Sequence, residues 1–147
     1  MLIVLEGCDG AGKTTLALSL AKILAAEIIH CTKDTPNDAG FFMNIIDAAK
    51  DRNIIADRFC YGQFVYQAPE ERPLSESQLY RLEIAMLASG TKVMYVTAPE
   101  KEIQKRLCAR GEIPLIEIPR IIKGYDKVWE NSMLTPIVWY TGEGLRL

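Results

Sequence analysis

Residues 1–15, MLIVLEGCDGAGKTT, decide how this chain folds. An apolar run leads into a glycine-rich segment that matches the pattern G-x-x-x-x-G-K-[ST] from Gly7 to Thr14. In this pattern backbone N–H groups surround a phosphate, and the glycines permit positive φ angles and a close approach of the backbone. A chance glycine-rich turn is the alternative, but the amphipathic segment that follows favours a strand, a phosphate-binding loop and a helix from Lys13 to about Ala26.

The residues of this loop have expected roles in binding ATP. Lys13 is expected to reach the β- and γ-phosphates as a point charge, and the Thr14 hydroxyl is expected to ligate Mg²⁺. The start of the helix adds a partial positive charge. The loop residues expected to bind ATP are Gly7, Asp9, Gly10, Ala11, Gly12, Lys13, Thr14 and Thr15.

Composition limits the classes of protein to which the chain can belong. Its 147 residues are expected to form one domain, and 49% hydrophobic with 24% charged residues is ordinary for a globular protein. A net charge of −2 provides no general basic field for a nucleic-acid backbone. Four scattered cysteines without a C-x-x-C pair favour reduced thiols in a cytoplasmic protein. No apolar run reaches membrane-spanning length, so no membrane partner is expected. The expected partners are small nucleotides that bind at a local site, and not nucleic acid.

The rest of the chain alternates between short apolar runs and helical patterns. Expected strands cover residues 27–32, 53–58, 92–97 and 135–140, and expected helices cover residues 37–51, 75–90, 100–110 and 116–131. Together with the first strand and helix, this alternation predicts an α/β sandwich: a five-stranded parallel sheet with helices on both faces.

Local signals specify the helices further. In the first helix Leu16, Leu20, Ile23 and Leu24 are expected to face the sheet. Thr35 is expected to cap the second helix, with Pro36 at its first position. The helix at 75–90 carries a capping box of Ser75 and Gln78. Its apolar stripe of Leu79, Leu82 and Met86 is expected to lie in the core or at a subunit interface, and we expect a homodimer.

A buried run at 53–56 ends in an acid and a base, Asp57 and Arg58. In a parallel sheet its carboxyl end opens onto the same edge as the phosphate loop. There Asp57 can lie near Mg²⁺ or its waters, and the Arg58 guanidinium can clamp a phosphoryl oxygen. A surface ion pair that caps the strand is the alternative.

Aromatic and amide side chains are candidates for a cleft beside this edge. Phe41 and Phe42 are adjacent in a helix, so they cannot both face the core, and one of them either meets a ligand or is half exposed. In a short helix expected at 59–67, the residues available to line a cleft are Tyr61, Gly62, Gln63 and Tyr66.

Two arginines near residue 108 are further phosphate-binding candidates. Glu102, Arg106 and Arg110 fall on one face of the helix expected at 100–110. An exposed Glu102–Arg106 ion pair is one interpretation, and arginines directed at phosphates are the other. The turn at 141–144, after the last strand, is expected to lie near the nucleotide base.

The phosphate loop identifies the class of ligand and leaves the reaction open. No N-K-x-D segment, which reads guanine in GTPases, occurs in the chain, and the chain is short for a motor ATPase. A small nucleotide kinase is therefore favoured.

The motifs resemble those of thymidylate kinases. Residues 5–15 resemble the E-G-x-D-G-x-G-K-[ST]-T loop of that family, and Asp57-Arg58-Phe59 resembles its D-R-[YF] motif. Residues 32–36, TKDTP, are similar to the family's T-R-E-P-G stretch, with Lys33 in place of arginine, and residues 106–112 resemble the start of its lid.

The resemblance implies a P-loop NTPase sandwich, with a short lid near residues 108–119, that transfers phosphate from ATP-Mg to a deoxynucleoside 5′-monophosphate. It implies that Asp9 meets the acceptor's sugar 3′-hydroxyl, Arg58 its 5′-phosphate, and Tyr66 its sugar or base. Lys33, Phe42, Tyr61 and Gln63 complete the expected acceptor site.

The loop has no arginine after Asp9, so the cation that stabilises the transition state must come from elsewhere, and Arg110, then Arg106, are the candidates. Two alternatives stay open. Residues 112–119 also resemble the lid exit of deoxynucleoside kinases, which would phosphorylate a nucleoside. A module that binds a nucleotide without catalysis is the other.

Overall fold

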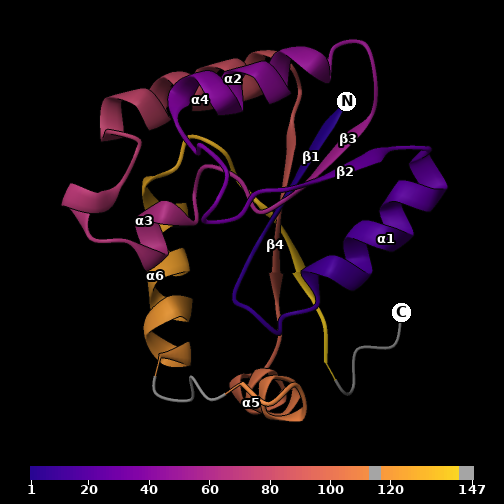
Figure 1. The fold of residues 1–147 in the computed structure, drawn as a ribbon, viewed down its shortest axis with the longest axis vertical. Coiled ribbons are helices and arrows are strands. Elements are labelled where there is room, and N and C mark those ends of the chain that lie inside the picture. Colours follow the sequence, from indigo (N-terminus) through magenta and orange to yellow (C-terminus); the bar gives the residue numbers. More distant parts are fainter. Residues whose placement is uncertain (113–116, 143–147) are drawn as a thin grey trace.

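The computed structural model describes residues 1–112 and 117–142. At its centre lies a five-stranded, all-parallel sheet with the strand order β2-β3-β1-β4-β5 (Figure 1). The strands are β1 (Leu2–Glu6), β2 (Glu27–His30), β3 (Ile54–Asp57), β4 (Lys92–Thr97) and β5 (Ile137–Tyr140). The helices are α1 (Lys13–Leu24), α2 (Ala39–Ala48), α3 (Gln63–Tyr66), the 3₁₀ turn η1 (Pro69–Glu71), α4 (Glu76–Ala88), α5 (Glu100–Ala109) and α6 (Ile118–Asn131). The predicted α/β sandwich is confirmed.

Helices cover both faces of the sheet because the side chains of each strand alternate between them. On the central strand β1, Leu2 and Val4 pack into the core formed with α2 and α4. Ile3 and Leu5 point the other way and pack against α1. All of β1 is buried, since β3 and β4 flank it.

Helix α1 uses a face slightly different from the predicted one. Leu16 and Ala17 are buried against the sheet, and Ala21 packs beside them. Ile23, which we expected in this face, is 77% exposed. The small side chains of Ala17 and Ala21 bring that side of the helix close to the sheet, which leaves Ile23 at the outer border.

Helix α2 begins later than predicted. Its cap is Asp38, whose Oδ1 accepts a hydrogen bond from the Phe41 N–H at 2.8 Å. Thr35, the predicted cap, instead donates its hydroxyl to the Thr32 carbonyl in the preceding turn. The chain cannot continue as a helix from Thr35 because Asn37 has a φ of +53°.

Helix α4 has apolar residues on two sides. The predicted capping box of Ser75 and Gln78 is present, and the predicted stripe belongs to the core, where Leu82 and Met86 are buried. The stripe is therefore not a free surface for a second subunit. The exposed apolar side chains of this helix are Tyr80, Ile84 and Leu87.

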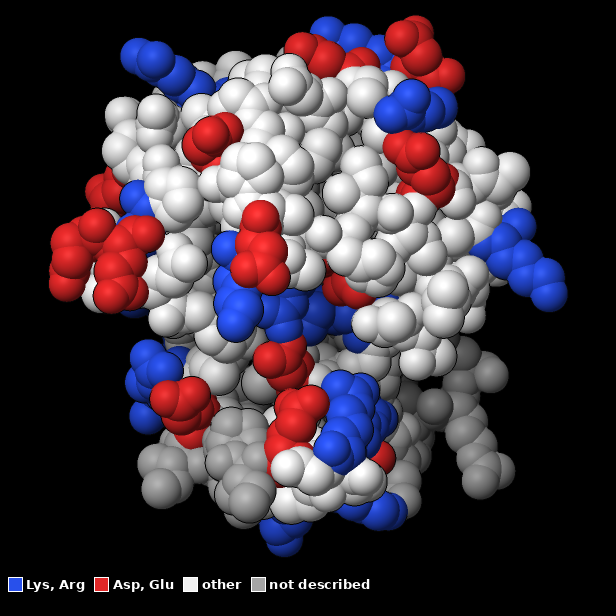
Figure 2. All heavy atoms as spheres, viewed as in Figure 1, with Lys and Arg blue, Asp and Glu red and all other residues white. Residues whose placement is uncertain are grey.

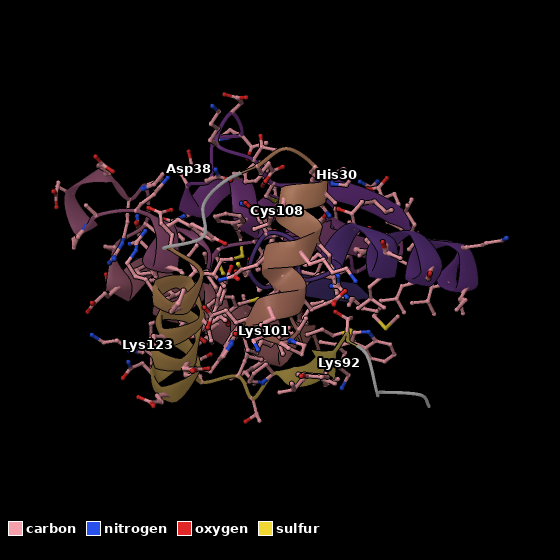
Figure 3. The ribbon with its side chains drawn as sticks, turned by 90° about the horizontal axis from the view of Figure 1, so that it is seen from below. His30, Asp38, Lys92, Lys101, Cys108 and Lys123 are labelled. Atoms are coloured by element: carbon pink, nitrogen blue, oxygen red, sulfur yellow. The ribbon has the colours of Figure 1, made fainter. Side chains whose placement is uncertain are left out.

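Helix α5 lies beneath the carboxyl ends of the strands, where the arrow of β4 points in Figure 1. Seen from below in Figure 3, it crosses the molecule with Lys101 and Cys108 along its length. Among residues 1–112 and 117–142, no helix combines the length and the apolar composition needed to cross a membrane.

Candidate active site

The predicted phosphate loop joins β1 to α1. Gly7 has a φ of 152° and Gly12 a φ of 105°. A Cβ on Gly7 would overlap the carbonyl oxygen of Val96 in β4, so only glycine fits where the loop leaves the sheet. Gly12 directly precedes α1, and the free N–H groups of the first helical turn therefore face the loop.

Lys13 places its ammonium group inside the loop. Its Nζ donates hydrogen bonds to the carbonyls of Gly7 (2.8 Å) and Cys8 (3.0 Å). Lys13 is buried, and burial lowers its pKa, while the nearby carboxylates of Asp57 and Glu6 act in the opposite direction. The positive charge is thus held at the centre of the loop.

Two side chains support the loop from its outer side. Arg106 donates from a terminal nitrogen to the Gly10 carbonyl (3.0 Å) and to the Thr141 hydroxyl (3.1 Å), and the Thr141 hydroxyl donates to the Ala11 carbonyl. Arg106 also pairs with Glu102 at 3.2 Å. Because these bonds engage loop carbonyls, they hold the loop against the end of β5. Glu143 and Gly144 of the expected base-side turn lie outside the described residues.

The carboxylate of Asp57 lies across from Thr14. The Thr14 hydroxyl donates to Asp57 Oδ2 at 3.2 Å, and His30 Nδ1 lies 3.2 Å from the same oxygen. Asp57 pairs with Leu5 in the register of β1 and β3, which brings the end of β3 to the loop. A hydroxyl and a carboxylate are oxygen ligands of the kind Mg²⁺ prefers, with phosphate oxygens supplying the remainder. In the part of the chain that the structure describes, no group of three His, Cys, Asp or Glu forms a separate metal site.

Arg58 connects the loop to a neighbouring cleft. Its guanidinium forms an ion pair with the Asp9 carboxylate and lies over the Tyr66 ring, 5.6 Å from the ring centre. Arg58 has a φ of +68°, which is unusual for a residue with a long side chain.

Two adjoining cavities meet at Asp9 and Arg58. The phosphate cavity, of about 100 Å³, is lined by Asp9, Gly10, Gly12, Lys13, Thr14, Thr15, Asp57, Arg58 and Arg110. The second cavity, of about 220 Å³, is called the acceptor cleft here after the role expected from the sequence. It is lined by Asp9, Cys31, Thr32, Lys33, Asn37, Arg58, Phe59, Gly62, Gln63, Tyr66 and Gln67. A molecule in the cleft therefore lies next to one in the loop.

Most predicted site residues come together here. Arg110, at the end of α5, lines the phosphate cavity, and Lys33, Gln63 and Tyr66 line the acceptor cleft. Gln63 is nevertheless occupied in holding the chain: its amide nitrogen donates to the Asn37 carbonyl, and its oxygen accepts from the Leu74 N–H. Residues 113–116 of the expected lid lie outside the described residues.

Phe42 and Tyr61, two predicted acceptor residues, are not brought to the cleft. Phe42 is fully buried, and its ring packs edge-on against Phe59, 4.7 Å between centres, because it lies on the core face of α2. Tyr61 is also fully buried and points away from the cleft. Its hydroxyl donates to Glu83 on α4 at 2.9 Å.

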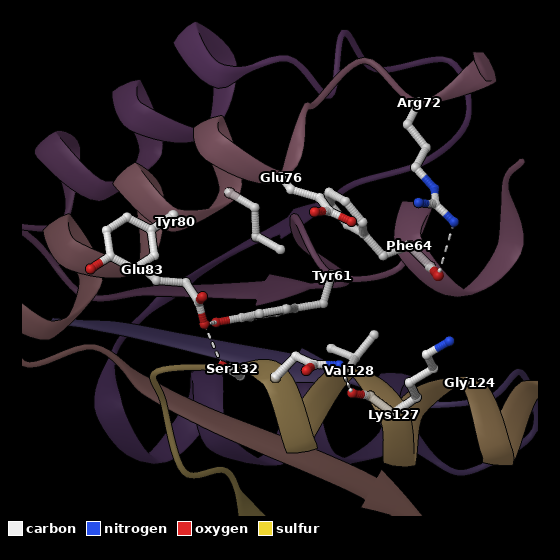
Figure 4. Close-up of a pocket in the computed structure, with 12 residues that line it drawn as sticks. Tyr61, Phe64, Arg72, Glu76, Tyr80, Glu83, Gly124, Lys127, Val128 and Ser132 are labelled. Atoms are coloured by element: carbon white, nitrogen blue, oxygen red, sulfur yellow. Dashed lines mark hydrogen bonds between the residues drawn. The ribbon is translucent and has the colours of Figure 1, made fainter. Parts of the chain in front are cut away.

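Tyr61 instead lines a separate cavity of about 450 Å³, which we call the distal cavity (Figure 4). It is lined by Tyr61, Phe64, Arg72, Glu76, Leu79, Tyr80, Glu83, Gly124, Lys127, Val128, Asn131 and Ser132. This cavity is larger than either cavity at the loop, but no residue of the phosphate loop lines it. Its buried carboxylate, Glu83, accepts from Tyr61, from the Ser132 hydroxyl and from the Met133 N–H.

Four residues of the site were not predicted from the sequence: His30, Cys31, Asn37 and Gln67. His30 is the last residue of β2 and Cys31 follows it, and β2 pairs in register with β3 so that His30 faces Asp57. The signal for them was the predicted end of a parallel strand, since all such ends meet at one edge. Asn37 and Gln67 gave no comparable signal because they lie in irregular segments.

The surface charge agrees with a local anion site. On the face drawn in Figure 2, acidic side chains are interspersed with basic ones, and the chain has a net charge of −2. The cations that converge at the loop, Lys13, Arg58 and Arg110, thus form a local feature.

Comparison with solved structures identifies the family. The YorR protein from Bacillus subtilis, solved in complex with phosphorylated GDP, matches with a TM-score of 0.81 and 33% identity, over 95% of this chain and 85% of that one. Deoxyadenosine kinase from M. mycoides (TM-score 0.57, 18% identity, 99% and 92% covered) and thymidylate kinase from Candida albicans (0.57, 16%, 98% and 84%) share the fold. Neither a family model nor a curated protein sequence matches the chain. With this fold, its phosphate loop and its likeness to YorR, the chain belongs to the same family as YorR and has the fold of the P-loop kinases.

Proposed function

We propose that this protein transfers the γ-phosphoryl group of ATP to a deoxynucleoside 5′-monophosphate, which becomes the diphosphate. The position of Arg58 carries this proposal, because Arg58 lines both the phosphate cavity and the acceptor cleft. A guanidinium at that junction can bind the acceptor phosphate beside the group that is transferred.

The donor phosphates would lie in the loop. Lys13 would bind the β- and γ-phosphates, and Arg110 would approach the transferred group from the end of α5. The Thr14 hydroxyl and the Asp57 carboxylate would hold Mg²⁺, which supplies neutralisation of the phosphate charge when bound. Arg106 and Thr141 would keep the loop in place near the nucleotide base.

The charges of the cleft favour a monophosphate over a nucleoside as the acceptor. Lys33 and Arg58 provide two cations, and among the described lining residues Asp9 is the only carboxylate. A nucleoside hydroxyl would benefit from a general base, whereas a phosphate acceptor is already ionised. Asp9 is paired with Arg58 and would meet the acceptor sugar, next to Tyr66.

The base of the acceptor is left open by these contacts. Because YorR was solved with phosphorylated GDP, guanine nucleotides belong in any test beside thymine, adenine and cytosine nucleotides.

A coupled assay of ATP consumption tests the proposal. Each of the four deoxynucleoside monophosphates and the corresponding nucleosides is offered as acceptor with ATP and Mg²⁺. Turnover with a monophosphate supports the proposal, and turnover with nucleosides alone would instead identify a deoxynucleoside kinase. ATP binding without turnover on any acceptor would identify a non-catalytic module. Arg58→Ala should abolish transfer, and Arg120→Ala, an exposed arginine paired with Glu117, is the matched control.

A further inference from the structure

Glu6 is a buried carboxylate to which the proposed reaction assigns no role. It is the last residue of β1, directly before the phosphate loop, and it is 0% exposed. Its Oε1 accepts a hydrogen bond from the Phe59 N–H at 3.2 Å. Phe59 is the residue that follows Arg58, so this bond joins the central strand to the segment that carries the guanidinium.

Arg58 needs such support because of its backbone conformation. Among the described residues, Ala25, Asn37 and Arg58 are the non-glycine residues with a positive φ. Ala25 ends a helix and Asn is a residue type that tolerates this region. Arg58 does not end a helix, and arginine is not a residue type that favours a positive φ. Such a conformation persists only where the surrounding structure holds it.

The two peptide groups on either side of Arg58 are both held by β1. The Arg58 N–H donates to the Leu5 carbonyl at 2.9 Å, and the Phe59 N–H donates to the Glu6 side chain. The Arg58–Leu5 bond is a backbone bond that continues the pairing of β1 and β3 by one residue. The second depends on a side chain, and it sets the direction in which the chain leaves Arg58.

We propose that Glu6 is a positioning residue that holds Arg58 in its left-handed conformation and thereby directs the guanidinium toward the acceptor phosphate. The kinetic part of this inference rests on the proposed function, whereas the conformational part does not. Removing the Glu6 acceptor frees the Phe59 peptide, and Arg58 then relaxes away from Asp9 and Tyr66.

The surroundings of Glu6 support a specific placement. Lys13 on α1 and Arg58 face Glu6 as cations. The other titratable groups near Glu6, whose pKa it raises, are Cys31, Cys60, Tyr66 and Tyr125. Burial raises the pKa of Glu6 to about 7, while the Phe59 bond, Lys13, Arg58 and the Gly62 backbone act to lower it. Burying a carboxyl group costs free energy. A carboxyl group that is nevertheless buried beside the two cations of the site is a candidate for a role there.

The first experiment measures amide hydrogen exchange by NMR in the free protein. Glu6→Met keeps the length of the side chain and removes both acceptor oxygens, whereas Glu6→Gln keeps one. We expect Glu6→Met to accelerate exchange of the Phe59 amide about tenfold or more, since the acceptor of its hydrogen bond is lost. Glu6→Gln should stay within about threefold of the wild type. The Arg58 side-chain N–H signal should lose its protection in Glu6→Met alone.

Glu83→Met is the matched control, because Glu83 is also a buried carboxylate but lies in the distal cavity. It should destabilise the protein without changing exchange at Phe59. Unchanged Phe59 exchange in Glu6→Met, or an equal change in Glu83→Met, would overturn the inference. If Glu6→Met does not fold, the wild type still decides, since a Phe59 amide that exchanges as an unprotected amide is not held by Glu6.

The second experiment separates positioning from general support of the fold. Glu6→Met should raise the KM for the monophosphate about tenfold while the KM for ATP changes less than about twofold. In an Arg58→Ala background, which transfers no phosphate, monophosphate binding is measured by calorimetry. There the same substitution should add no further loss in affinity, because its effect passes through Arg58. Equal rises in both KM values, or additive losses, would contradict positioning. If the wild type transfers no phosphate, the proposed function fails while the exchange result still stands.

Discussion

The loop edge of the sheet and the distal cavity each bury a carboxylate, and the two are surrounded differently. Glu83 is 3% exposed, and one of its oxygens accepts from the Tyr61 hydroxyl, the Ser132 hydroxyl and the Met133 N–H. Glu6 accepts from the Phe59 N–H by its Oε1, and its Oε2 has no partner among the described residues. The buried carboxylate of the distal cavity thus finds its hydrogen-bond donors within the chain, as is typical of a structural site. The loop edge keeps unsatisfied groups next to cations, as binding sites do.

The largest expected difference between the two regions concerns their lysines. Lys13→Ala should lower phosphoryl transfer by about 10³-fold or more, because it removes the charge at the centre of the loop. Lys127→Ala, at the distal cavity, should leave the rate unchanged. Steady-state kinetics on both variants measures this contrast, and equal losses would mean that the loop has no special role.

Arg110→Ala should lower kcat by about 10³-fold with little change in ATP affinity, since an arginine that stabilises the transition state acts on the chemical step. Kinetics combined with ATP binding by calorimetry separates the two effects. A loss confined to ATP affinity would instead place Arg110 in ground-state binding.

Glu6 should also make the stability of the protein depend on pH. The pKa of Glu6 is raised from 4.5 to about 7 in the folded protein, so the folded state binds more protons between these values. The contribution of Glu6 is therefore fully present below pH 4.5 and is lost as the pH rises toward 7, by about 3 kcal/mol at most. Denaturant unfolding at several pH values should show this slope in the wild type. Glu6→Gln should remove it, and an unchanged slope in Glu6→Gln would assign the effect to another group.

Glu83→Gln should have the smallest effect, a loss of about 1 kcal/mol in the free energy of unfolding, because it weakens bonds to a charged acceptor while keeping their geometry. Chemical denaturation measures the loss. Acceptor KM should equal that of the wild type, and a raised KM would show that the distal cavity communicates with the acceptor cleft.

Much of the phosphate site follows from local sequence. Gly7, Gly12 and Lys13 lie within one short loop whose pattern defines its backbone. Asp57 ends a strand that must reach the same edge of the sheet, and Arg58 follows it. The cleft was harder to predict, because its lining comes from several irregular segments. Gln63 lies in the cleft as expected, but packing assigns its amide to Asn37 and Leu74.

The sequence by itself determined the succession of strands and helices along the chain, the phosphate loop, and the acid and base at the end of β3. Each of these depends on neighbours in the chain. Tertiary structure alone decided that Phe42 and Tyr61 turn away from the cleft, that His30 reaches Asp57, and that Glu6 holds the segment after Arg58. The physical reason is that a side chain's direction depends on which elements pack beside it. That packing joins residues as far apart in the sequence as Glu6 and Phe59.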